Sequence, residues 1–197
     1  MGLLISLSLI TALEVGGLPA PLSRAQDTAS TMKVANVTMP TRVRVGDQDL
    51  VLNGMALRKK FVVKVYVAAL YLPEKTSDAD QILQADGPRY MVMSFVHSVD
   101  KGKLCEAWND GLQNNTPDAG DELKADFKRL CDMMEDIKDG EQMVFNYVPA
   151  TGTTVGVRGT DRGTIEGKAF ADALFRCWIG PKPGPGEGFK KNLLGGG

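Results

Sequence analysis

Two polar side chains suited to holding an anion lie in the segment that contains the clearest predicted strand, residues 52–72, LNGMALRKKFVVKVYVAALYL. Side chains alternate along a strand, so Lys64 and Tyr66 share one face of the strand predicted over Phe61–Leu72. Both faces of this strand are largely apolar, and both are therefore predicted to be covered. A buried ammonium needs a partner or a route to solvent, and an ammonium beside a phenol suits an amphiphile with an anionic head. The alternative is that Lys64 extends to the rim and Tyr66 only packs.

The other reactive residues give weaker signals. His97 is the only histidine, and we expect it to cap the end of a strand rather than to act as a catalytic base. Cys105, Cys131 and Cys177 lack metal-ligand spacing. Buried free thiols are expected, and one disulfide plus one free thiol is the alternative in an oxidising compartment. Dinucleotide, P-loop, zinc-protease and serine-hydrolase motifs are absent from the sequence, so we expect no catalytic residue, metal or cofactor.

The overall charge narrows the class of partner. Lys and Arg total 23 and Asp and Glu total 24, for a formal net charge of -1. This balance argues against a nucleic-acid binder and against a polybasic membrane-surface protein. The length of 197 residues, 43% of them hydrophobic, suits one globular domain, or one domain preceded by a processed leader.

The leader is predicted from the first uncharged run, residues 3–13 (LLISLSLITAL). It is too short to span a bilayer, which takes about 20 apolar residues, and fits the apolar region of a signal peptide. A small-x-small pattern at Ser23–Ala25 allows cleavage after Ala25. We therefore expect a signal peptide over 1–25, a flexible segment over 26–33 and one domain over 34–197, exported to a periplasm with no stable membrane span. The alternative is a buried N-terminal helix, which Gly16, Gly17 and two prolines would interrupt.

Hydrophobic periodicity predicts the elements that position these residues. Strands are expected at 34–45 (with a break at Pro40), 50–52, 61–72, 89–96, 142–148 and 153–157, with a further strand ending near 165. Turns are expected at 46–49 and at Asn53-Gly54. Helices are expected at 78–85 with Ser77 as N-cap, at 101–112, 121–137 and 168–179, and as a last turn at 189–194. This order is not a regular β-α-β alternation and favours an α+β fold with a mostly antiparallel sheet.

An ordered set of short motifs resembles the chalcone isomerase-like family, in particular its exported bacterial branch. The matching stretches are Leu52-Asn53-Gly54, Arg58-Lys59-Lys60-Phe61, 64–72 (KVYVAALYL), the strand Met91–Val96 and the helix after it, Gly152-Thr153, 170–175 (FADALF), Trp178-Ile179-Gly180 and Leu193-Leu194-Gly195. The resemblance runs from about Val34 to the C-terminus. It implies an open-faced β-sandwich, a large mostly antiparallel sheet with helices packed on one side and a ligand cleft between them.

The family has two kinds of member. Plant chalcone isomerases close a flavanone ring, and related plastid proteins bind fatty acids without this activity. In both, an arginine after the Gly-rich turn reaches the cleft, and Arg58 matches it. The next strand carries a threonine in the isomerases and a tyrosine in the fatty-acid binders, and Tyr66 matches the latter. The resemblance thus implies a non-enzymatic binding protein for a fatty acid or similar apolar anion, with Arg58 as charge partner and Tyr66 as hydrogen-bond donor.

Two other functions stay open. One is an intramolecular lyase or isomerase acting on an enone, although 100–104 (DKGKL) lacks the isomerases' tyrosine and 93–96 (MSFV) lacks their lysine. The other is a partner-binding scaffold with a filled cleft, in an unknown oligomeric state. Arg58 and Tyr66 would lie roughly 26 Å apart on one straight strand. Their pairing therefore requires a hairpin between them, near Lys59-Lys60; otherwise Lys64 is the partner of Tyr66.

Overall fold

A computed structural model describes residues 30–196, and its centre is a seven-stranded antiparallel sheet. Each strand pairs with its neighbour in the sequence, in the order β3-β4-β5-β6-β7-β8-β9. The strands are β3 (Arg42–Val45), β4 (Gln48–Lys60), β5 (Val63–Leu72), β6 (Arg89–Phe95), β7 (Gln142–Val148), β8 (Gly152–Val157) and β9 (Thr160–Ile165). A separate hairpin of β1 (Thr31–Val34) and β2 (Val37–Pro40) precedes them.

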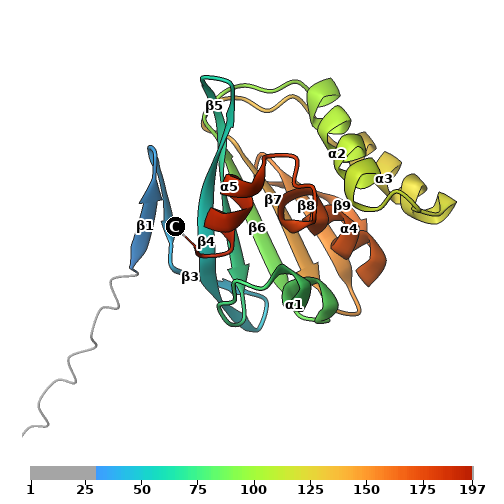
Figure 1. The fold of residues 1–197 in the computed structure, drawn as a ribbon, viewed down its shortest axis with the longest axis horizontal. Coiled ribbons are helices and arrows are strands. Elements are labelled where there is room, and N and C mark those ends of the chain that lie inside the picture. Colours follow the sequence, from blue (N-terminus) through green and yellow to red (C-terminus); the bar gives the residue numbers. More distant parts are fainter. Residues whose placement is uncertain (1–29, 197) are drawn as a thin grey trace, which may run out of the picture.

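The helices lie over one face of the sheet (Figure 1). They are α1 (Ala79–Gln84), α2 (Lys101–Asn115), α3 (Asp121–Met133), α4 (Lys168–Ile179) and α5 (Glu187–Leu193). The main core lies between them and the sheet, where Ala68 and Leu70 of β5 meet Trp178 of α4. The predicted α+β class, with helices on one side of a mostly antiparallel sheet, is confirmed.

A smaller core covers part of the opposite face. It joins Val67, Ala69 and Tyr71 of β5 to Met39 of β2. The Tyr71 hydroxyl donates a hydrogen bond of 2.9 Å to the carbonyl oxygen of Pro40. The C-terminal half of β5 is therefore buried on both faces, as its uninterrupted apolar sequence predicts.

The turn predicted at Asn53-Gly54 is wrong, because both residues lie inside β4. The Asn53 side chain donates to the carbonyl oxygen of Leu193 (3.1 Å) and accepts from the backbone N–H of Thr76 (2.8 Å). A Cβ atom on Gly54 would lie 2.3 Å from the carbonyl oxygen of Asn192. The dipeptide thus lets the end of α5 approach the sheet backbone, a use of glycine that local sequence does not distinguish from a turn.

Other predicted boundaries shift by a few residues. The helix predicted over 121–137 ends at Met133, and Ile137 instead forms a β-bridge with Val99. The N-cap of α1 is Asp78 rather than Ser77, because the Asp78 carboxylate accepts two backbone N–H bonds. Strand β1 begins at Thr31, so it overlaps the segment 26–33 that was expected to be flexible. The predicted signal peptide, 1–25, lies outside the described residues.

Between residues 30 and 196, none of the helices combines the length and apolar character needed to cross a membrane.

Gly54→Ala is predicted to destabilise the protein by about 1–3 kcal/mol, because the added methyl group forces α5 away from β4. The matched control is Gly188→Ala within α5, where nothing lies within 4 Å of an added Cβ. The control should be neutral or up to about 1 kcal/mol more stable. Urea unfolding measures both, and equal stabilities for the two variants would contradict this account of α5 docking.

Candidate functional site

The β4–β5 hairpin places Arg58 directly opposite Tyr66 in the antiparallel register. Residues that face each other across such a pair point to the same side of the sheet, with Cβ atoms roughly 4.5–5.5 Å apart. The hairpin that their pairing requires is therefore present. Its turn lies at Phe61-Val62, just beyond the expected position at Lys59-Lys60.

Tyr66 is enclosed by aromatic side chains from both layers. Its ring packs against Phe95 of β6 and edge-on against Phe189 of α5, with centroids 5.5 and 5.9 Å away. Its hydroxyl accepts a hydrogen bond of 3.1 Å from the Trp178 indole N–H. Burial raises the pKa of Tyr66 to about 12, although the Trp178 hydrogen bond and the Arg58 charge lower it. Within residues 30–196 no acceptor takes the hydroxyl proton, so the phenol remains available as a donor.

Arg58 is half-buried beside this phenol. One guanidinium N–H donates to the carbonyl oxygen of Pro185, in the loop before α5, at 3.1 Å. In the described part of the chain, no carboxylate forms an ion pair with Arg58. Because a guanidinium carries five N–H donors, Arg58 keeps most of its capacity to bind an anion.

Lys64 does not join this pair, and its predicted placement on a covered face is wrong. A register shift between Arg58 and Lys59 inserts Val65 as an extra residue on β5, which breaks the strict alternation of side chains. Lys64 instead faces Lys59 across the hairpin and is exposed near the tip. The alternative in which its ammonium reaches solvent is the one observed.

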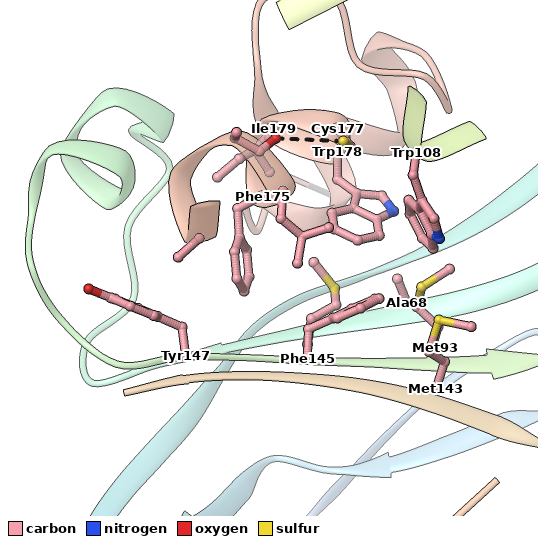
Figure 2. Packing of buried hydrophobic residues seen from close by; sticks show 14 of the residues in the cluster. Ala68, Met93, Trp108, Met143, Phe145, Tyr147, Phe175, Cys177, Trp178 and Ile179 are labelled. Atoms are coloured by element: carbon pink, nitrogen blue, oxygen red, sulfur yellow. Dashed lines mark hydrogen bonds between the residues drawn. The ribbon is translucent and has the colours of Figure 1, made fainter. Parts of the chain in front are cut away.

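The space between sheet and helices is filled by the protein's own side chains. Figure 2 shows Trp108 and Trp178 of the helices above Phe145 of the sheet. The ring centroids of the two indoles lie 5.3 Å apart, and the ring centroid of Phe145 lies 5.7 Å from that of Trp178. Hollows of about 560 and 190 Å³ lie elsewhere, and neither is lined by Arg58 or Tyr66. The open cleft expected beside this pair is neither of these hollows, and a filled space between sheet and helices is the feature expected of the scaffold alternative.

The C-terminal segment covers the site, a role that the sequence alone does not predict. Phe189 of α5 covers the Tyr66 ring, and the carbonyl oxygen of Pro185 accepts a hydrogen bond from the Arg58 guanidinium. The only signal in the sequence was the short apolar pattern at 189–194, which predicts a helix but not the strand it covers. The sequence gives Trp178 as part of a family motif, and it does not predict the hydrogen bond from the Trp178 indole to Tyr66.

Arg89 is a second arginine of note, which no motif in the sequence singles out. It is only 1% exposed and pairs with Asp172 of α4 at 2.7 Å. It also donates to the carbonyl oxygen of Ala85 at 2.9 Å, and its guanidinium lies over the Tyr147 ring. Arg89 starts β6, so it lies at the end of the sheet opposite Arg58. Its charge is matched within the protein, and it joins α1, β6 and α4.

Within residues 30–196, His97 and the three cysteines form no hydrogen bond with Arg58 or Tyr66, although Cys177 lies close enough to contribute to the raised pKa of Tyr66. His97 is exposed just beyond the end of β6. Cys177 is buried in α4, whereas Cys105 and Cys131 are partly buried on α2 and α3, and all three are free thiols. No group of three or more His, Cys, Asp or Glu side chains within residues 30–196 could hold a metal ion.

Comparison with known proteins agrees with this architecture. The family model described as chalcone isomerase-like matches residues 31–195. The chain belongs to the chalcone isomerase-like family. The solved structure of a fatty-acid binding protein from Arabidopsis thaliana has the same fold, with a TM-score of 0.67 at 16% identity over 84% of this chain and 96% of that one. A search of the curated proteins finds no match.

The environment of Tyr66 predicts an alkaline titration that a surface tyrosine would not show. All four tyrosines of this chalcone isomerase-like protein have raised pKa values: Tyr66, Tyr71 and Tyr147 to about 12, and Tyr90 upward. Tyr66, Tyr71 and Tyr147 should therefore contribute little phenolate absorbance between pH 10 and 11 while the protein is folded. The protein unfolded in guanidinium should titrate near the ordinary value of about 10.

Because the folded pKa of Tyr66 is raised, its stabilising effect is complete below pH 10 and is lost as the pH rises toward 12. Tyr66→Phe should flatten the fall of the unfolding free energy across this range. A phenolate midpoint near 10 for all four residues in the folded protein would contradict the enclosed site.

Proposed function

We propose that this protein binds a fatty acid or a similar apolar anion without converting it. The carboxylate is held by the Arg58 guanidinium and accepts a hydrogen bond from the Tyr66 hydroxyl. One observation carries the proposal: a half-buried arginine with no carboxylate partner among the described residues lies beside a phenol whose proton is free.

The two donors differ in what they contribute. A guanidinium can meet a carboxylate with two parallel, charge-assisted hydrogen bonds, which a lysine ammonium cannot do. A tyrosine phenol is protonated at neutral pH, and burial raises the pKa of Tyr66 further, so its hydroxyl can donate to the same carboxylate. Charge-assisted hydrogen bonds are strengthened where water is excluded, as beneath α5.

The acyl chain needs space that α5 now occupies. Replacement of the Pro185 carbonyl by a ligand carboxylate would release the loop 181–186 (PKPGPG) from Arg58. Movement of α5 would then withdraw Phe189 from its place against Tyr66. The vacated volume is apolar, since Phe95 and Tyr66 form its floor. An aliphatic acyl chain would therefore take the place of the apolar Phe189 side chain.

The comparisons support a binding role. The fold is shared with a protein described as fatty-acid binding, and the family resemblance associates a tyrosine at position 66 with the fatty-acid binders of the family.

The predicted leader further supports export to the bacterial envelope. We infer this location from residues 1–25 alone.

Calorimetric titration of delipidated protein with a saturated fatty acid tests the proposal. Arg58→Met should weaken binding at least tenfold, because a hydrogen bond to a charged group contributes about 1.5–3 kcal/mol. Tyr66→Phe should weaken it less, by about three- to tenfold. The control is Arg42→Met, which removes an exposed arginine of β3. Binding unchanged in Arg58→Met would defeat the proposal, as would Arg58-dependent turnover of a chalcone.

The site-closing role of Phe189 gives a separate expectation. Phe189→Ala should cost about 3–5 kcal/mol of stability, because it leaves a cavity beside Tyr66. The same cavity should bind the fatty acid more tightly, and saturating ligand should restore part of the lost melting temperature. Weaker binding by Phe189→Ala would show that the acyl chain does not use this volume.

A further inference from the structure

Exposed apolar side chains in the described residues gather at one point, the tip of the β4–β5 hairpin. Phe61 is 92% exposed and Val62 93%, and Val63 follows at 41%. Within residues 30–196, Met32 is the only other exposed large hydrophobic residue. Figure 1 shows this hairpin (teal) ending at the outer edge of the molecule, opposite the end that carries α1.

Uncompensated positive charge surrounds this apolar tip. Lys59, Lys60 and Lys64 are exposed, and none of them forms an ion pair with a carboxylate in the described part of the chain. The sequence contains no acidic residue between Asp49 and Glu74. In a protein with a formal net charge of -1, the basic residues are thus concentrated locally.

The backbone conformation and the exposed side chains of the tip do not stabilise the fold. Phe61 has a φ of 55° at the first central position of a two-residue turn, where a β-hairpin favours glycine. A bulky residue in this conformation is strained, and its ring contributes almost nothing to the core because it lies in solvent. Strained, exposed apolar residues of this kind point to a function rather than to packing.

We infer that the hairpin tip, residues 59–64, docks onto an anionic lipid surface. Phe61 and Val62 enter the interface between headgroups and acyl chains, and the three lysines meet the anionic headgroups. Apolar burial combined with attraction between lysines and anionic lipid is the combination that holds proteins at a membrane surface.

A lipid surface fits the shape of the tip better than a protein does. Specific protein interfaces bury about 800 Å² on each partner, whereas a projecting turn with two apolar side chains offers only a few hundred. A bilayer requires no complementary groove. It also presents anionic charge on all sides of the inserted residues, which matches lysines on both strands of the hairpin.

The docking inference stands without the proposed function, but the two sites lie close together. Arg58 is three residues before Phe61 in the sequence, roughly 10 Å at the usual strand rise. If the proposed function holds, docking places the carboxylate-binding pair within reach of the headgroup layer, where free fatty acids reside.

Sedimentation with lipid vesicles tests the inference. Protein should bind vesicles of phosphatidylcholine with 30% phosphatidylglycerol and bind phosphatidylcholine alone at least tenfold more weakly. Lys59→Gln/Lys60→Gln/Lys64→Gln should lower partitioning into the anionic vesicles by on the order of 100-fold, since each lysine near an anionic surface contributes about fivefold. Added salt should weaken binding of the parent protein.

Matched variants separate docking from general charge and from folding. Lys33→Gln/Lys75→Gln/Lys138→Gln removes the same charge from exposed positions elsewhere and should bind anionic vesicles like the parent. Phe61→Gly should keep or raise the melting temperature, because glycine accepts the positive φ, yet lose most vesicle binding. Val62→Trp should shift the fluorescence to shorter wavelength when anionic vesicles are added, because the new indole enters the lipid interface. The shift reports position 62, because Trp108 and Trp178 are already buried.

Three outcomes would overturn the inference. The first is no vesicle binding by the parent protein. The second is an equal loss in the tip and control lysine variants, which would indicate a non-specific charge effect. The third is concentration-dependent self-association that Phe61→Gly abolishes while vesicle binding persists, which would assign the tip to a contact between copies of the chain.

Discussion

The proposed binding site depends on one juxtaposition: an arginine without a carboxylate partner in the described chain lies beside a neutral phenol, beneath a short C-terminal helix. The antiparallel register of β4 and β5 creates it by setting Arg58 opposite Tyr66. A positive charge that is removed from water favours any anion that reaches it. In the closed conformation a backbone carbonyl, that of Pro185, fills this place with a dipole instead of a full charge.

The docking of α5 follows from the same hairpin. Gly54 and Ala56 of β4 lie on the face that carries Arg58, and their small size admits the helix close to the sheet. Asn53 then binds the end of α5 through Leu193. A ligand must therefore compete with contacts that are built into the fold. We infer that binding and α5 displacement are coupled, while the aromatic core between α4 and the sheet stays intact.

The sequence predicted the architecture better than the site. Periodicity placed the strands and helices because most of them bury one face. Asn53-Gly54 was misread as a turn because its reason, the approach of α5, lies 140 residues away. The Arg58–Tyr66 pairing followed from family resemblance plus a required hairpin. Lys64 was misplaced because a bulge at Val65 breaks the alternation of side chains. The net charge of the whole chain gives no sign of the basic hairpin tip, which becomes evident only from the exposed positions of its lysines.

The most direct test of the central claim is the ionisation of the ligand itself. Carbon-13 NMR of a carboxyl-labelled fatty acid, bound to the protein and followed against pH, reports the pKa of that carboxyl. The account predicts a bound carboxyl whose pKa is lowered by the adjacent guanidinium, and the return of this pKa toward its ordinary value in Arg58→Met. The same bound pKa in the parent protein and in Arg58→Met would show that the carboxylate lies elsewhere.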